Sequence, residues 1–307
     1  MHALTHTPTR PLLVLHLALT AAFAATVTPS FATESGGSTW PLGLENFVAA
    51  AMPPPGHYGM VFGNYYHADR LKDGDGNTIP VAFDVKAAVV APRFVWVTGE
   101  KVFGGQLAFH AVTPLVDLKL SVAGTSQNKS GLGDITVGPV LGYHFSPALH
   151  SVVALDFTMP TGGFGKTELA NIGRNYLTIR PVFATSYIDP TGFNGDFVAV
   201  YNSNFKNKDT DYQSGDEVNI DYSLGWGLGN GFVLGIGGHW YRQIDDDTQA
   251  GTRVGPDGNR GRSFSIGPSL KYDSGKGWFV TAKWQQESGV RNKAEGNALW
   301  IKAVFPL

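Results

Sequence analysis

Apolar and polar residues alternate along much of the chain, which is the pattern of β-strands that separate two environments. In the segment 217–228, every even-numbered residue from Val218 to Leu228 is apolar, and every odd-numbered residue is polar or glycine. The segments 134–145, 263–272 and 299–305 show a similar two-residue period. This repetition predicts an all-β fold.

We interpret the pattern as twelve strands joined in an up-and-down antiparallel meander. Pro92 and Pro114 interrupt two long apolar runs and should mark ends or bulges, because proline disrupts hydrogen bonding inside a sheet. The twelve strands are expected to begin near His57, Pro80, Val102, Gly133, His150, Asn175, Phe193, Glu217, Gly231, Arg262, Gly277 and Asn297.

The links between these strands alternate in length. The short links are Thr98–Lys101, Ser146–Leu149, Ile188–Gly192, Gly229–Asn230 and Asp273–Lys276. The long polar links are Lys72–Thr78, Thr125–Leu132, Thr161–Arg174, Lys206–Asp216, Asp245–Gly261 and Gly289–Gly296. A meander would therefore have short turns at one end and long loops at the other. Outer-membrane β-barrels have this asymmetry, with the short turns in the periplasm.

Aromatic residues flank the short links. Trp226 and Phe232 lie on either side of Gly229–Asn230, and Tyr272 and Trp278 flank Asp273–Lys276. Rings of this kind form girdles at the membrane interface of barrels, although aromatic pairs also cap hairpins in soluble sheets. Together with the sorted links, they favour a transmembrane β-barrel.

Residues 1–32 contain the basic, apolar and cleavage regions of a secretory signal peptide in their usual order. Arg10 precedes the apolar run Leu12–Val27, and Ser30-Phe31-Ala32 offers small residues for cleavage. No later stretch reaches the about 18 apolar residues of a helical span. We therefore expect export to the outer membrane of a Gram-negative cell, with residues 57–307 crossing it as strands.

Residues 33–56 are expected to be a separate N-terminal segment, either periplasmic or plugging the lumen. Pro53-Pro54-Pro55 cannot continue a helix and gives a stiff link into the first strand. An apolar stretch left free in the periplasm would be a sticky patch. We expect Leu42–Met52 to form a short plug at the periplasmic end of the barrel, with a free or partner-bound tail as the alternative.

Composition narrows the function classes. The 23 basic and 25 acidic residues give a net charge of −2, which argues against nucleic-acid binding. The absence of cysteine excludes disulfides, thiolate metal sites and cysteine nucleophiles. The segment Gly162–Thr167 lacks the helix that a phosphate-binding loop needs, and the histidines are scattered. No cofactor, metal site or catalytic residue is predicted.

The lumen of such a barrel should be narrow. Barrels of about eight strands are filled by side chains, whereas those of about 16 strands hold an open channel. The candidate lumen-lining residues are Asp134, His144, Arg180, Asp196, Asn202, Glu217, Asn219, Asp221, His239, Lys271, Lys283 and Lys302. Both signs of charge are present, so selection of solutes by charge is not indicated.

Three motifs resemble a known family. Met52–Tyr58 follows Glu45-Asn46-Phe47, and Gly131–Ile135 and Pro160-Thr161-Gly162 come later. Together they resemble the family associated with the meta-pathway of phenol degradation, a group of outer-membrane transport proteins. The resemblance spans nearly the whole mature chain and implies passive uptake of small hydrophobic compounds, aromatic ones included. Many such barrels end in phenylalanine, whereas this chain ends Phe305-Pro306-Leu307.

Two other functions are left open. The first is a structural or adhesive barrel without transport. The second is an outer-membrane lipolytic enzyme, which would need a serine and a histidine on the outer face. Ser203 lies on the apolar face, but Phe205 replaces the glycine expected after Ser-Asn, and none of the clearly assigned strands places a histidine on that face. The expected partners are the lipid bilayer, small hydrophobic solutes and the barrel-assembly machinery.

Overall fold

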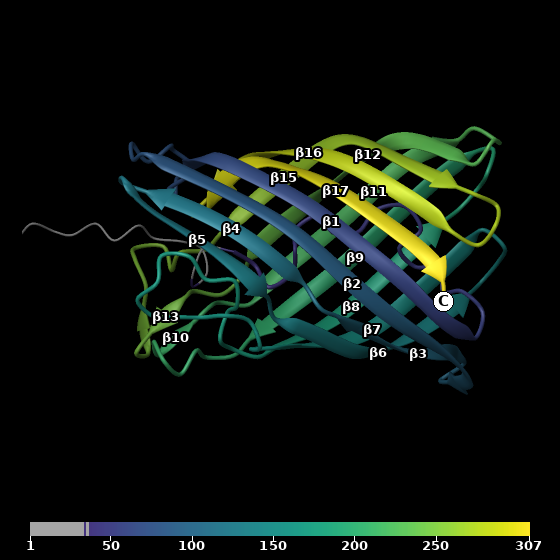
Figure 1. Cartoon of the computed structure of the whole chain (residues 1–307), viewed down its shortest axis with the longest axis horizontal. Helices are drawn as coiled ribbons and strands as arrows, with labels where there is room; N and C mark the ends of the chain where they lie inside the picture. Colours follow the sequence, from purple (N-terminus) through teal and green to yellow (C-terminus); the bar gives the residue numbers. More distant parts are fainter. Residues whose placement is uncertain (1–33, 35–36) are drawn as a thin grey trace, which may run out of the picture.

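The structure is a computed structural model that describes Glu34 and residues 37–307. It is a closed antiparallel barrel of twelve strands (Figure 1). Closure occurs at β1 (Gly56–Leu71), which pairs with β17 (Ala294–Pro306) on one side and with β2 (Phe83–Val102) on the other. The predicted all-β up-and-down barrel is confirmed, while the predicted signal peptide lies outside the described residues.

The other barrel strands follow one another around the wall in chain order. Each predicted strand begins within three residues of an observed one. These strands are β3 (Gly105–Val112), β6 (Ile135–His144), β7 (Leu149–Met159), β8 (Thr178–Tyr187), β9 (Phe193–Asn204), β11 (Glu217–Gly227), β12 (Phe232–Gln243), β15 (Arg262–Asp273) and β16 (Phe279–Arg291). No helix in the described part of the chain is long and apolar enough to cross a membrane.

The prediction of a long loop at Thr125–Leu132 is wrong. These residues form β5 (Thr125–Leu132), which pairs with β4 (Leu115–Val122). Beyond Pro114, β4 continues β3 along β2 in one register, so the hairpin extends the wall past the barrel (Figure 1). The loop after β7 contacts β5 through Lys129 and Glu168. The sequence of β5 is polar, so no alternation marked it as a strand.

Two further link predictions are wrong. Thr98–Lys101 belongs to β2, and the turn follows at Phe103 and Gly104, which both have positive φ. Most of Gly289–Gly296 is strand, because β16 and β17 are joined by residues 292 and 293 alone. The remaining long loops lie at the end predicted for them, and they carry the short strands β10 (Tyr212–Gln213), β13 (Thr248–Gln249) and β14 (Thr252–Arg253). We name the two ends of the barrel the long-loop end and the short-turn end.

The alternation predicted in β11 is confirmed. Leu224 lies on the outer face with 45% of its surface exposed, whereas its neighbour Ser223 is fully buried inside. Aromatic pairs surround the short-turn end; for example, the ring centroids of Phe232 and Tyr272 are 4.8 Å apart. The outer face therefore combines an apolar belt with an aromatic girdle, as a membrane-spanning barrel requires.

Candidate functional site

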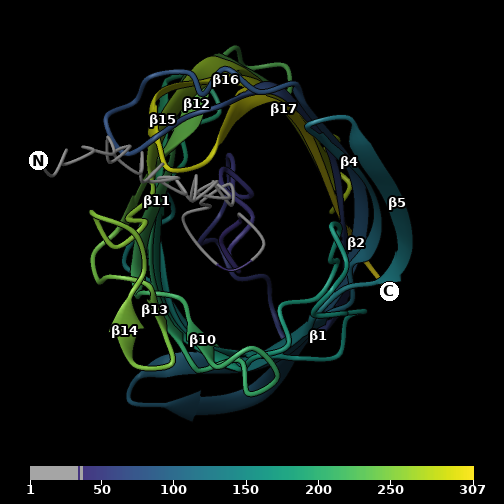
Figure 2. The same ribbon diagram turned by 90° about the vertical axis from the view of Figure 1, so that its left-hand side faces the viewer.

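The lumen holds the N-terminal segment, residues 37–55, which precedes β1 (Figure 2). Just before it, Glu34 accepts a 2.8 Å hydrogen bond from Asn207 Nδ2 at the long-loop end. At the other end, Pro54 O accepts a hydrogen bond of 2.9 Å from Tyr58 OH, near the start of β1. The segment thus runs along the length of the lumen, whereas the sequence analysis expected it only at the short-turn end.

Glycines on the inner face make room for this segment. A Cβ atom on Gly142 of β6 would lie 2.8 Å from Met52, and one on Gly225 of β11 would lie 2.6 Å from Phe47. Both distances are too short for real side-chain contacts, so the absence of a side chain at these positions lets the segment pack against the wall.

Asp221 of β11 is the central anchor of the N-terminal segment. Its buried carboxylate accepts hydrogen bonds from Trp40 Nε1 at 3.1 Å, Gly43 N at 2.9 Å and Glu45 N at 3.0 Å. Hydrogen bonds to an ionised acceptor are about twice as strong as neutral ones. One carboxylate therefore holds the turn formed by residues 40–45.

Glu45 extends this anchor to three cationic side chains. Its carboxylate lies 3.0 Å from Lys302 Nζ and 3.6 Å from Arg93 Nη1, and its carbonyl accepts a 2.7 Å hydrogen bond from Lys283 Nζ. Buried charges are stable only when they are paired and hydrogen-bonded. Glu45 thus compensates the basic residues of the wall.

Arg180 of β8 holds the segment nearer the long-loop end. Its Nη2 donates to Thr39 O at 3.0 Å, and its guanidinium lies 5.3 Å from the ring centre of Trp40. Its Nε donates to Asn202 Oδ1 at 2.6 Å, which fixes the plane of the guanidinium. Arg180 therefore contacts both the backbone and a side chain of the segment.

The short-turn half of the segment is held through its backbone. Ala49 N donates to Asp196 Oδ1 at 2.8 Å, and Ala50 N donates to Ser186 Oγ at 2.9 Å. Ser186 also hydrogen-bonds to Asp196, so the two acceptors are themselves linked. Polar contacts therefore continue along most of the segment.

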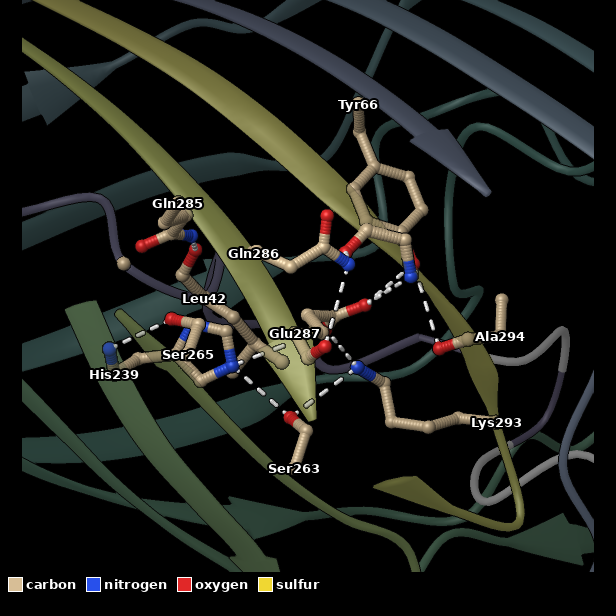
Figure 3. Close-up of polar contacts among 12 residues, drawn as sticks. Leu42, Tyr66, His239, Ser263, Ser265, Gln285, Gln286, Glu287, Lys293 and Ala294 are labelled. Atoms are coloured by element: carbon tan, nitrogen blue, oxygen red, sulfur yellow. Dashed lines mark hydrogen bonds and ion pairs between the residues drawn. The ribbon is translucent and has the colours of Figure 1, made fainter. Parts of the chain in front are cut away.

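A buried polar network joins β12, β16 and the turn before β17, next to the wall residues that contact the N-terminal segment (Figure 3). Glu287 lies 2.6 Å from Lys293 Nζ and 3.8 Å from His239 Nε2. Further along β16, Gln285 Nε2 donates to Leu42 O at 3.0 Å. The network thus connects the wall to the N-terminal segment.

The structure brings most of the predicted lumen residues together around this segment. Those in direct contact with it are Arg180, Asp196, Asn202, Glu217, Asp221, Lys283 and Lys302. Asn219, His239 and Lys271 are buried in the wall, and no hydrogen bond joins them to the segment within the described part of the chain. Asp134 accepts hydrogen bonds from backbone N–H groups of the loop after β7. His144 ends β6 and lies at the exposed rim, so its predicted place inside the lumen is wrong.

A cavity of about 340 Å³ lies beside the N-terminal segment. Its lining is mostly apolar and comes largely from β1–β4 and β6–β8, with Phe62, Ala91, Val112, Val116, Val140 and Val182 among its side chains. Three polar atoms of lining residues have no hydrogen-bond partner among the described residues: Arg93 Nε, His110 Nδ1 and Trp300 Nε1. All three atoms are buried beside the cavity and do not face its open space, and buried polar atoms are usually paired.

His110 is oriented by a hydrogen bond that crosses a neighbouring strand. His110 Nε2 of β3 lies 2.8 Å from Asp156 Oδ1 of β7, and Gly138 of β6 leaves the space between them free. In neutral His110, Nε2 carries the hydrogen toward the carboxylate and Nδ1 is left as an acceptor. Sequence reasoning missed both residues, although His110 stands between Ala108 and Val112 on the inward positions of its strand.

Comparisons with known proteins agree with this architecture. The structure resembles the COG4313 outer membrane channel from Pseudomonas putida F1, with 16% sequence identity, a TM-score of 0.73, and coverage of 86% of this chain and 99% of that one. It also resembles the transport unit of the autotransporter AIDA-I from Escherichia coli, with 9% identity, a TM-score of 0.54, and coverage of 86% and 93%. Comparison with curated proteins gave no match.

These likenesses establish the fold, which is that of outer-membrane barrels. Combined with the apolar belt and the aromatic girdle, this fold places the protein in the outer membrane. Residues 68–303 match the family described as "Putative MetA-pathway of phenol degradation". The match covers more than half of the chain, and the protein therefore belongs to this family.

Proposed function

We propose that the protein is a passive channel for small hydrophobic compounds, aromatic ones included, across the outer membrane. The observation that carries this proposal is the apolar cavity of about 340 Å³ beside the N-terminal segment. An apolar protein cavity of about 150 Å³ is large enough to bind benzene. The cavity therefore offers room for a single substituted ring. Moving such a ring from water into the cavity lowers the free energy.

The polar atoms of residues that line the cavity narrow the range of solutes that fit it. Arg93 Nε and Trp300 Nε1 are donors, and His110 Nδ1 is an acceptor in the neutral ring. Because these atoms are buried, a hydroxyl or carboxyl group of a solute would pair with one of them only after its side chain turns toward the cavity, while the ring of the solute contacts the apolar wall. Solutes with many polar groups would lose hydration without enough partners.

The N-terminal segment restricts passage in this proposal. It runs along the lumen, and hydrogen bonds and ion pairs hold it at Arg180, Asp221 and Lys302. These contacts are reversible, so the segment can shift while the barrel strands stay paired. Passage then depends on how often the segment leaves its anchors.

Uptake by intact Gram-negative cells that make the protein tests the proposal, because the lipopolysaccharide leaflet slows the entry of hydrophobic solutes that would cross a liposome bilayer unaided. Compared with cells that lack the protein, we expect it to increase uptake of a single-ring solute such as toluene more than uptake of the sugar arabinose. Ala91→Trp should fill the cavity and reduce toluene uptake. Ala88→Trp is the matched control, because Ala88 lies on the outer face of the same strand. Equal uptake by Ala91→Trp and the unmodified protein would contradict the route through the cavity.

The same assay separates the alternatives. A purely structural or adhesive barrel would increase the uptake of neither solute. A lipolytic enzyme would hydrolyse phospholipid, but within the described residues no histidine is hydrogen-bonded to Ser203. We therefore favour the channel over the enzyme.

A further inference from the structure

Three arginines form a row on the outer face of the barrel at its long-loop end. Arg242 of β12 lies opposite Arg262 of β15, and Arg262 lies opposite Arg291 of β16. Neighbouring strands are about 4.8 Å apart, so three positive charges stand side by side. Like charges directly opposite each other destabilise a sheet, and the charge of Arg262 is repelled by both neighbours.

The row points outward at the border of the apolar belt. Arg242 and Arg262 are exposed, as are Trp240 and Phe264, the next outward residues toward the membrane centre. On β16, a bulge near Gly289, which has a φ of +61°, shifts the register and turns Arg291 to the same face. The three guanidinium groups therefore lie where lipid headgroups meet the barrel.

The described residues provide no ion-pair partner for any arginine of the row. Three acidic residues, Asp73, Asp75 and Asp257, line the same pocket as the row at the long-loop end, but no ion pair joins them to the row among the described residues. Asp73 accepts hydrogen bonds from Asn77, and Asp257 accepts one from Asn292. Arg262 Nε donates to Gly289 O at 3.1 Å, which orients its guanidinium. The row thus has uncompensated charge and free N–H donors.

We propose that Arg242, Arg262 and Arg291 bind phosphate groups of the glycolipid in the outer leaflet, lipopolysaccharide. Long loops of outer-membrane barrels face the cell exterior, so the row lies in the leaflet that contains this lipid. A guanidinium group presents paired N–H donors that match a phosphate, and arginine is favoured over lysine for this purpose. A phosphorylated headgroup would supply the anion that the row lacks in the protein itself.

Binding of lipid A to the refolded full-length mature protein in detergent tests this site. The ligands are bisphosphorylated lipid A, the same lipid without phosphates, and inorganic phosphate. The test variant is Arg242→Gln/Arg262→Gln/Arg291→Gln. The control is Lys101→Gln/Lys206→Gln/Lys276→Gln, which removes the same charge from scattered exposed positions. The single variant Arg262→Gln gives a second measurement in case the triple variant does not fold.

We expect the triple variant to bind bisphosphorylated lipid A at least about tenfold more weakly, and Arg262→Gln to bind it several-fold more weakly. The control should bind like the unmodified protein, and the lipid without phosphates should bind weakly to all forms. Equal binding by the unmodified protein and Arg262→Gln would overturn the proposal. Inorganic phosphate that binds as tightly as lipid A would show a free anion as the ligand and would also overturn it.

Discussion

The two sides of the lumen differ in the contacts that they make with the N-terminal segment. One side, the polar wall, consists of β8, β9, β11, β12 and β15–β17 and holds the segment through residues such as Arg180, Asp221 and Lys283. The other side, the cavity wall, consists of β1–β4, β6 and β7 and faces the cavity with residues such as Ala91 and Val112. Apart from the ion pair between Glu45 and Arg93 of β2, the segment is therefore fastened along the polar wall, and the remaining space lies along the cavity wall.

This difference shows how one barrel can be both closed and permeable. Charged side chains of the polar wall are stable because the segment supplies their partners. The cavity wall offers mainly dispersion and burial, which do not depend on one exact partner. A solute can thus replace solvent beside the cavity wall without breaking the ion pairs of the polar wall.

Removing the partner of the polar wall should have the largest effect. We expect deletion of Thr33–Met52, with the signal peptide kept, to raise single-channel conductance several-fold, because a twelve-stranded barrel is wider than the barrels of about eight strands that side chains alone fill. The charged residues of the polar wall would then be hydrated. Heat-dependent migration on a gel checks that the barrel has folded. Unchanged conductance in a folded deletion variant would show that the segment does not restrict the pore.

A charge placed on the outer face should be costly, in contrast to the charges inside. Leu224→Arg should lower the free energy of unfolding by about 2–4 kcal/mol if the residue lies near the bilayer midplane. Asn128→Arg is the control, because Asn128 lies on β5 beyond the barrel. Urea titration in lipid vesicles measures both, and equal losses would mean that the outer belt does not face lipid.

The sequence predicted which residues face outward and which face inward better than it predicted the contents of the lumen. The alternation in β11 correctly placed Leu224 outside and Asp221 inside, because a two-residue period follows directly from strand geometry. It could not show that Asp221 binds backbone groups of Gly43 and Glu45, since those contacts depend on distant parts of the chain. The segment Thr125–Leu132 was missed because a strand outside the membrane has no apolar face to reveal it.

Weakening the central anchor should loosen the segment without opening the barrel. Asp221→Asn removes the charge that strengthens three hydrogen bonds, so we expect amide exchange at Gly43 and Glu45 to accelerate by about tenfold or more. Asn219→Ala is the matched control two residues away, because the Asn219 amide has no partner among the described residues. Similar exchange in both variants would show that Asp221 is not the anchor.

The loops above the polar wall should respond weakly to pH. Burial raises the pKa of Asp247 from 3.8 to about 7, although Tyr212 OH and Gly215 N donate to its carboxyl group. A raised pKa means that this group stabilises the folded loops fully below pH 3.8 and that the contribution is lost as the pH rises through about 7.

Limited proteolysis of the loop 244–261 should therefore be faster at about pH 8 than at about pH 5. Asp247→Asn keeps the side chain neutral and should remove most of this dependence. If the rate of proteolysis of Asp247→Asn depended on pH equally steeply, a group other than Asp247 would be responsible for the pH dependence.

The most direct test of the account is to lock the N-terminal segment to the polar wall. Ala50 N lies 2.9 Å from Ser186 Oγ, and the chain has no cysteine of its own, so Ala50→Cys/Ser186→Cys is a suitable pair for a single defined disulfide, whose formation is checked first by thiol titration. We expect intact cells that make the oxidised double variant to lose the protein-dependent uptake of toluene and to regain it on reduction with dithiothreitol, while cells with either single variant are unaffected by either treatment. Uptake that is equally fast in the oxidised and the reduced double variant would contradict a segment that must move for passage.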